Sequence, residues 1–185
     1  MALLQIPYVA KFLWAPVLDH LRIPGFGRRR GWIIVLSLAL MASLCALGSL
    51  DPATQLGAIS LLGLLTTFLS ASLDIAIDAY RRELLPDNEL GLGNTIHVNA
   101  YKLAGLVPGS LALFLADRGT AWPLVFAIVA LFMLPGMVMA FLVAEPPVTG
   151  KPPRTLDEVV IAPFKEFFTR KGVRYGLEIL LFIFL

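Results

Sequence analysis

The sequence predicts an all-α bundle of membrane-spanning helices, and three observations support this prediction. Hydrophobic residues make up 58% of the 185-residue chain and charged residues 15%, whereas an average soluble domain has about 45–50% and 25%. The mean hydropathy is +0.81. Several apolar runs reach the length of about 20 residues that a helix needs to cross a bilayer. This composition argues against a soluble enzyme, a disordered tail and, with a net charge of only +2, a nucleic-acid-binding protein.

Four of the apolar runs are complete, and two more are interrupted or cut short. The stretch 1–18 contains Pro7, Lys11 and Pro16, and the stretch 175–185 is apolar up to its last residue. The first stretch lacks the basic segment and the small-residue cleavage site of a signal peptide. We therefore expect an internal piece of a longer membrane protein that begins and ends inside a helix. The four complete runs cover residues 32–50, 56–79, 92–116 and 122–143.

Basic residues are concentrated in alternate loops. Loops 20–31, 81–91 and 144–174 hold twelve of the 15 Lys and Arg residues, whereas the two opposite loops hold only Arg118. Loops rich in Lys and Arg stay on the cytoplasmic side of a membrane. The sequence therefore predicts that these three loops are cytoplasmic, which sets the orientation of every predicted helix.

The sequence divides into three predicted parts. Residues 1–143 form a transmembrane bundle, and residues 144–174 form a cytoplasmic linker. The linker begins with a proline-rich stretch and continues with an amphipathic segment at 156–169, which suits a helix lying along a membrane surface. Residues 175–185 are predicted to begin the next membrane helix.

Ionisable side chains occur in only some of the apolar runs. Each costs about 2.5–3.5 kcal/mol at the centre of a bilayer on insertion scales, so each indicates a polar interior or a functional site. The runs 32–50 and 122–143 contain none and are predicted to be lipid-facing supports. The ionisable residues of the other runs are Lys11, Asp74, Asp78, His97, Lys102 and Glu178.

The run 56–79 carries its polar residues on one helical face. Ser70, Asp74 and Asp78 are each four residues apart, which places them one above the other on a helix. Two carboxylates so close repel each other when both are ionised, so one of them is expected to bind a proton readily, as a proton carrier must. The alternative is that Asp78 pairs with Arg82 as a purely interfacial ion pair.

The next run carries a lysine near the middle of the membrane. Lys102 lies about 15 Å into its helix and must either pair with a carboxylate or face water. Asp74 is the nearest candidate in depth, and the pair is either part of a proton-coupling site or a structural bridge. Asn99 shares the face of Lys102, and Tyr101 shares a neighbouring face with His97. His97 is either a proton shuttle or a packed hydrogen-bonding residue.

The chain has no motif for catalysis or for a metal. It contains no GxxxxGK[ST] phosphate loop, no HExxH and no GxSxG, and its single cysteine, Cys45, excludes an intramolecular disulfide. We therefore expect neither an enzyme nor a metal or cofactor site. An ATP-driven assembly would need a separate ATPase subunit, and a purely structural subunit would not need Asp74 and Lys102 at depth.

Five segments resemble the AmpG-type muropeptide permeases of the major facilitator superfamily. The basic loop is similar to the loop between helices 2 and 3 of that superfamily, where an Asp precedes a Gly–basic cluster, here Asp19 and residues 27–30. The resemblance implies a twelve-helix transporter, of which the chain covers helix 2 to the start of helix 7. The segments are IPYVAKFLWAPVLD, GRRRGW, SASLDIAIDAYRRELLP, YKLAGLVPGSLALFLAD and AEPP.

The resemblance also implies a function. It implies multi-pass insertion in the bacterial inner membrane and proton-driven import of anhydro-muropeptides, which are sugar-peptides from cell-wall breakdown. The partners would be this small solute, the lipid and the C-terminal half of the same transporter, and the proton gradient would replace a cofactor. The alternative is another amphiphile, such as an acyl-CoA or a drug-like solute.

Two groups of residues are predicted to serve transport. The first couples protons and lines the solute cavity, and the second forms a cytoplasmic latch that binds acidic residues in one access state and releases them in the other. The first comprises Asp74, Asp78, Lys102, Asn99, Tyr101 and Ser70, and the second comprises Asp19, Arg28, Arg29 and Arg30.

Overall fold

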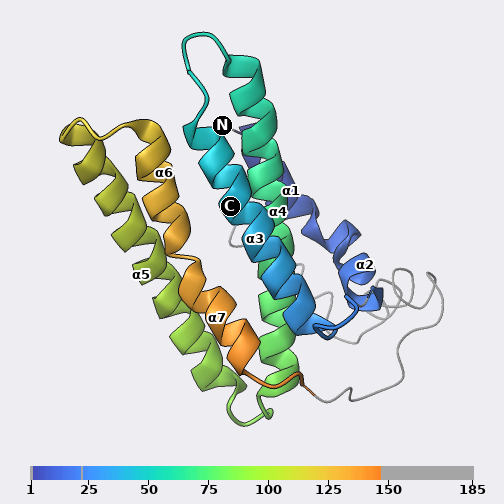
Figure 1. Ribbon diagram of the computed structural model, residues 1–185. Helices are drawn as coiled ribbons and strands as arrows, with labels where there is room; N and C mark the ends of the chain where they lie inside the picture. The colour runs from blue at the N-terminus through green and yellow to red at the C-terminus, as the bar shows by residue number, and fades with distance from the viewer. Residues whose placement is uncertain (1, 22, 147–185) are drawn as a thin grey trace, which may run out of the picture. The chain divides into compact units, whose positions relative to one another are not determined.

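The computed structural model describes residues 2–21 and 23–146 (Figure 1). All regular structure in these residues is helical, apart from an isolated β-bridge between Ile23 and Gly27. The predicted linker, except for residues 144–146, and the predicted start of the next helix at 175–185 lie outside the described residues.

Four helical segments are long and apolar enough to cross a membrane, as the sequence predicts. The largest difference from the predicted bounds is in α4, which continues from the predicted end at residue 79 to Leu84. The helix ends there because Leu85 precedes Pro86, and the residue before a proline disfavours helical backbone. Leu85 is accordingly extended. The segments are α3 (Arg29–Gly48), α4 (Leu56–Leu84), α5 (Leu90–Asp117), and α6 (Trp122–Leu131) followed by α7 (Leu134–Leu142).

The first apolar stretch is a series of short helical pieces rather than one long helix. Proline lacks a backbone N–H, and its ring clashes with the carbonyl four residues earlier. Pro16 follows the turn at Trp14 that ends one piece, and Pro7 lies in the first turn of another. The pieces are η1 (Ala2–Gln5), α1 (Ile6–Ala10), η2 (Lys11–Leu13) and α2 (Ala15–His20).

Two further prolines have different effects on their helices. Pro135 cannot donate to the carbonyl of Leu131, and the chain forms a turn at Phe132 and Met133 that separates α6 from α7. Pro108 lies inside α5, which stays continuous along its whole length. Pro108 and Pro135 both lie inside apolar runs, yet only Pro135 is preceded by a break in the helix.

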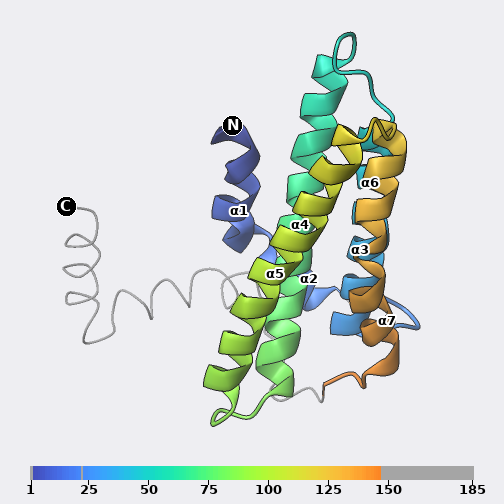
Figure 2. The ribbon, with the colours of Figure 1, turned by 90° about the vertical axis from the view of Figure 1, so that its left-hand side faces the viewer.

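Helix α3 packs between α4 and α6 and provides much of the core. Figures 1 and 2 show α1 beside α4, on the side away from α6. A 2.8 Å hydrogen bond between Ser43 and Thr66 joins α3 to α4. The prediction of a lipid-facing support at 32–50 therefore holds for only one face, on which Val35 and Leu38 are exposed. The core comprises Ile33, Ile34, Leu36, Leu40, Leu73, Ala76 and Ala140.

Candidate functional site

The polar face of α4 is covered by the short helical pieces at the start of the chain. The Lys11 ammonium of η2 donates to Asp74 Oδ2 of α4 at 2.5 Å. One turn away, the hydroxyls of Tyr8 and Ser70 hydrogen-bond at 2.6 Å. The pieces η1, α1 and η2 all pack against α4, which directs both side chains at that helix. Ser70 and Asp74 are therefore on one face, as predicted, and their partners come from residues 1–18.

Helix α5 brings a third titratable group to the same place. The carboxylate oxygens of Asp74 and Asp78 and a ring nitrogen of His97 all lie within 4.8 Å of one another. Asp78 also accepts a 2.8 Å hydrogen bond from Arg81, one turn further along α4. We call these residues, together with Lys11, the titratable cluster.

The titratable cluster is balanced in charge and open to exchange. Two carboxylates face two cations, so the cluster is formally neutral when His97 is uncharged. The Asp74 side chain is 29% exposed and the Lys11 side chain 35% exposed. A metal ion between Asp74, Asp78 and His97 would have to displace Lys11 and Arg81, so the arrangement is that of an ion-pair cluster. Such an arrangement allows one ion-pair partner to be exchanged for another.

The predicted pairing of Lys102 with Asp74 is not what the structure shows. Asp74 pairs with Lys11, and within the described residues no hydrogen bond or ion pair joins Lys102 to another group. The reason is packing: α5 lies on α6, whereas η2 lies directly on α4. Similar depth along two helices therefore did not bring the two side chains together.

The other predicted residues of α5 face outward in the described part of the chain. Tyr101 is 70% exposed and Lys102 is exposed as well. Asn99 donates to the carbonyl of Thr95 within its own helix at 2.8 Å. Their role in a solute cavity thus remains a prediction, since the structure brings only His97 of this helix to the titratable cluster.

The alternative pairing of Asp78 with Arg82 is also replaced. Asp78 pairs with Arg81, three residues away, and Arg82 pairs with Asp87 at 2.7 Å. Arg82 lies on the part of the helix that faces the following turn, where Asp87 is available. Asp78 is thus bonded within α4, next to Asp74.

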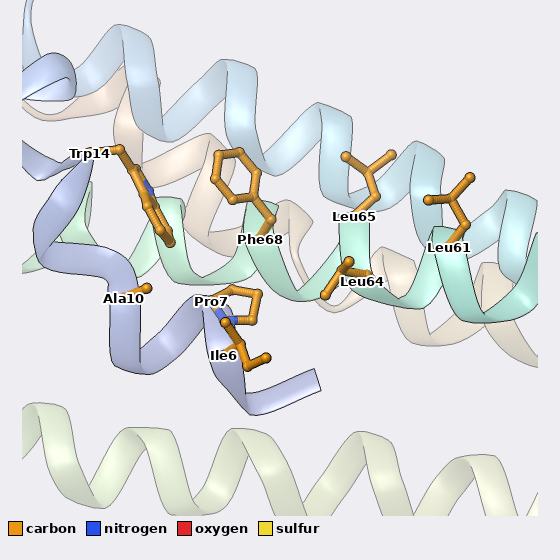
Figure 3. A pocket seen from close by; sticks show the side chains of 8 residues that line it. All are labelled: Ile6, Pro7, Ala10, Trp14, Leu61, Leu64, Leu65 and Phe68. Carbon is orange, nitrogen blue, oxygen red and sulfur yellow. The ribbon is translucent and has the colours of Figure 1, made fainter. Parts of the chain in front are cut away.

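An apolar hollow of about 420 Å³ lies between α1 and the preceding turns of α4 (Figure 3). The Trp14 and Phe68 rings pack at a centroid distance of 4.8 Å, and the Trp14 indole N–H donates to Ser72 at 3.0 Å. The Trp14–Ser72 hydrogen bond is the polar contact that a lining residue of the hollow makes with α4. Its lining residues are Ile6, Pro7, Ala10, Trp14, Leu61, Leu64, Leu65 and Phe68.

Three of the four predicted latch residues, Asp19, Arg28 and Arg29, come together at the last turn of α4. The Arg29 guanidinium donates to Glu83 at 2.8 and 3.1 Å and also to Asp19, and Arg28 donates to Glu83 at 2.6 Å. The Arg29 side chain is only 7% exposed. We call Asp19, Arg28, Arg29 and Glu83 the arginine network. The sequence analysis missed Glu83, although it lies in the segment SASLDIAIDAYRRELLP.

Arg30, the fourth predicted latch residue, lies outside this network. It caps the C-terminal end of α7, while Glu145, which follows α7, caps the N-terminal end of α3. The Arg30 guanidinium donates to the carbonyls of Ala140 and Phe141 at 2.6 and 2.7 Å, in the last turn of α7. In return, the carboxylate of Glu145 accepts the backbone N–H groups of Arg29 and Arg30 at 2.7 and 3.2 Å. Each charged group satisfies backbone groups that a helix end leaves free, with the sign that the helix dipole favours.

Comparison of the sequence with known proteins identifies its family. Residues 2–185 match the family model of the Major Facilitator Superfamily. The anhydromuropeptide permease of Escherichia coli K12 is 41% identical over 165 residues, which are 89% of this chain and 34% of that protein. An uncharacterized protein of Haemophilus influenzae is 47% identical, over 98% of this chain and 43% of that protein.

More distant relatives belong to the same group. A putative transporter AmpG 4 of Rickettsia conorii is 28% identical over 92% of this chain. The predicted resemblance to AmpG-type permeases is therefore confirmed. The chain spans about a third to two fifths of the length of these relatives. Together with four apolar helices, the relatives indicate a multi-pass inner-membrane protein.

Proposed function

This chain belongs to the major facilitator superfamily, and on that premise we propose that its complete gene product imports anhydro-muropeptides across the inner membrane, driven by protons. The similarity to the anhydromuropeptide permease of Escherichia coli supports the solute class. Two of the relatives described above are named as a permease and a putative transporter, which supports a carrier and not an enzyme.

The titratable cluster is the observation on which proton coupling rests. Asp74 lies ten residues before the end of α4 at Leu84, about 15 Å along the helix axis. An ionised group at that depth in a membrane is costly, so its presence points to a functional site. Asp74 has a carboxylate neighbour, Asp78, and one ion-pair partner among the described residues, Lys11. A proton on Asp74 would break that pair and change the charge of the cluster. Each charge state then favours a different arrangement of the bundle, which is what coupling requires.

The arginine network supports a second element of the proposal, a latch. Arg29 holds acidic groups from two different segments, Asp19 and Glu83. We propose that this network stabilises one access state of the transporter. Charge neutralisation at Arg28, Arg29 and Arg30 would then shift the balance between inward-open and outward-open states without abolishing insertion.

Uptake into vesicles with an imposed pH gradient tests the coupling. The substitution Asp74→Asn removes the proton site, and we expect it to abolish gradient-driven accumulation of a labelled anhydro-muropeptide while downhill exchange continues. Asp78→Asn should have a smaller effect, since Asp78 is nearer the helix end and already bonded to Arg81. Arg118→Gln is the control, because Arg118 lies in a loop on the opposite side of the bundle from the cluster. Normal gradient-driven uptake by a correctly inserted Asp74→Asn protein would contradict the proposal.

A different amphiphilic solute, such as an acyl-CoA or a drug-like molecule, is the second candidate. The apolar hollow beside Trp14 and Phe68 favours it, because an acyl chain or aromatic group would find a matching surface next to polar groups. Competition decides between the two: excess unlabelled acyl-CoA should leave muropeptide uptake unchanged if the first candidate is right.

A further inference from the structure

Lys11 is the cation of the titratable cluster that comes from outside α4. Arg81 is three residues from its partner on the same helix and stays near it in any rigid movement of α4. Lys11 belongs to η2, a three-residue 3-10 piece that follows α1 directly and ends at the turn at Trp14. Its side chain is 35% exposed and reaches Asp74 through a 2.5 Å bond. Of the two cations, Lys11 is therefore the one that can leave its carboxylate.

Proton binding determines when Lys11 becomes free. With both carboxylates ionised, Lys11 and Arg81 balance Asp74 and Asp78. A proton on Asp74 removes one negative charge, so the cluster carries a net positive charge and the Lys11 ammonium lacks its partner until an anion takes the place of the carboxylate. The natural replacement is a carboxylate group on the solute.

We propose that Lys11 is a binding residue for a solute carboxylate and that protonation of Asp74 releases it for this role. The inference rests on the proposed proton coupling and adds the solute group that is recognised and the residue that recognises it. One proton and one carboxylate then enter the cluster together, so its net charge is the same before and after loading. A neutral cluster costs less than a charged one while the site is closed to water between the two access states.

Four groups face this switch from the surrounding elements. Asp78 and Arg81 approach from α4, His97 from α5, and the Tyr8 hydroxyl bonds Ser70 one turn away. His97 is the only one of these four whose ordinary pKa lies between pH 5 and 8. Any pH dependence of solute binding must therefore be assigned between Asp74 and His97 by substitution.

The test measures equilibrium binding to the purified complete gene product, without a gradient. The two probes are an anhydro-muropeptide with free carboxylates and the same molecule with those groups converted to carboxamides. Between about pH 5.5 and 8 a free peptide carboxylate stays ionised, because its pKa is about 3.3–3.7. We expect the acid probe to bind more tightly as the pH falls, since protonation of Asp74 frees Lys11, whereas the amide probe should show little change.

Substitutions at Lys11 test the anion site. Lys11→Gln should weaken binding of the acid probe by about tenfold or more, which is the range of one charge-assisted hydrogen bond. Its preference over the amide probe should then disappear. Lys11→Arg should keep most of it. The double substitution Lys11→Gln with Asp74→Asn avoids an unpaired carboxylate and should also lack the preference, which guards against loss of folding as the cause. Equal weakening of both probes by Lys11→Gln, or loss of the preference in Lys102→Gln instead, would overturn the proposal.

Substitutions at the proton site test the switch. Asp74→Asn should bind the acid probe at all pH values as tightly as the wild type does at low pH. His97→Gln should keep the pH dependence; its loss there would assign the proton to His97 and refute the role of Asp74. Because binding is measured without a gradient, the binding role of Lys11 can fail while gradient-driven uptake succeeds. Conversely, the binding role can hold while Asp74→Asn leaves gradient-driven uptake intact, which would refute the proposed coupling alone.

Discussion

The last three turns of α4 carry ion pairs of two different kinds. In the arginine network, Glu83 accepts from two arginines and Arg29 donates to two carboxylates, and their side chains are only 19% and 7% exposed. In the titratable cluster, Asp74 is 29% exposed and, among the described residues, has Lys11 as its one ion-pair partner. Buried charges with several partners are expensive to separate, whereas a half-exposed single pair can exchange its partner for a proton at modest cost. The same helix thus carries one set of charges that holds its position and another that can change.

Substitution of the two carboxylates gives the largest expected difference. Glu83→Gln leaves the Arg29 guanidinium buried with only one carboxylate, and we expect a loss of about 3–5 kcal/mol in the free energy of unfolding. Asp74→Asn should cost less than about 1 kcal/mol, because the Lys11 ammonium is partly exposed and can be solvated when its partner is neutral. Thermal unfolding of the purified complete gene product, followed by circular dichroism, measures both.

The exposed pair of Arg82 with Asp87 provides the control for that comparison. Its side chains are 63% and 88% exposed, so Asp87→Asn should change stability by no more than about 0.5 kcal/mol. If Glu83→Gln is no more destabilising than Asp87→Asn, the arginine network does not hold its end of the bundle together.

A smaller effect is expected at Gly27, which lies beside the arginine network. Gly27 has φ of +89°, and a Cβ there would lie 2.7 Å from Oε2 of Glu145. Gly27→Ala should therefore combine backbone strain of about 1–3 kcal/mol with displacement of the Glu145 cap. Gly25 has φ of +85° with nothing within 4 Å of a Cβ, so Gly25→Ala carries the strain alone. The difference between the two variants in unfolding midpoint measures the cap, and identical midpoints would mean that the cap contributes nothing.

The smallest effect concerns Asp51, in the loop at the opposite ends of α3 and α4. The backbone N–H of Ala53 and the hydroxyl of Thr54 donate to this carboxylate and hold its pKa below the usual value. A carboxyl with a lowered pKa adds stability above its unfolded-state pKa and loses it as the pH falls through the folded-state pKa. Thr54→Ala should raise the pKa of Asp51 toward its ordinary value, as an NMR titration of that carboxyl can show. If the pKa of Asp51 does not change in Thr54→Ala, the hydrogen bond from Ala53 alone lowers it.

The sequence was sufficient to predict the helices but not the pairing of charges. Apolar length fixes where a helix crosses a membrane, so four spans were predicted to within a few residues. Pairing depends on how each helix is rotated and on which neighbour it packs against. Lys102 matched Asp74 in depth, yet Lys11 makes the contact because η2 packs on α4, whereas α5 packs on α6.

The partners of the clustered arginines could not be predicted from the sequence either. The clustered arginines predicted a site that binds acidic residues, and Asp19 was identified from its place before them. Glu83 and Glu145 were not identified, because each is separated from the arginines by a large part of the chain. No local pattern in a single sequence reports such a contact.

The cap that Glu145 places on α3 has a consequence for the order of assembly during synthesis. Its acceptor oxygens serve backbone groups that were made 115 and 116 residues earlier. At a translation rate of about 5–20 residues per second, the ribosome needs about 6–23 s to supply that carboxylate. For this interval the first turn of α3 has to wait inside the translocation machinery or at the membrane surface without its cap. The beginning of the first long helix is therefore among the last parts of the bundle to be completed.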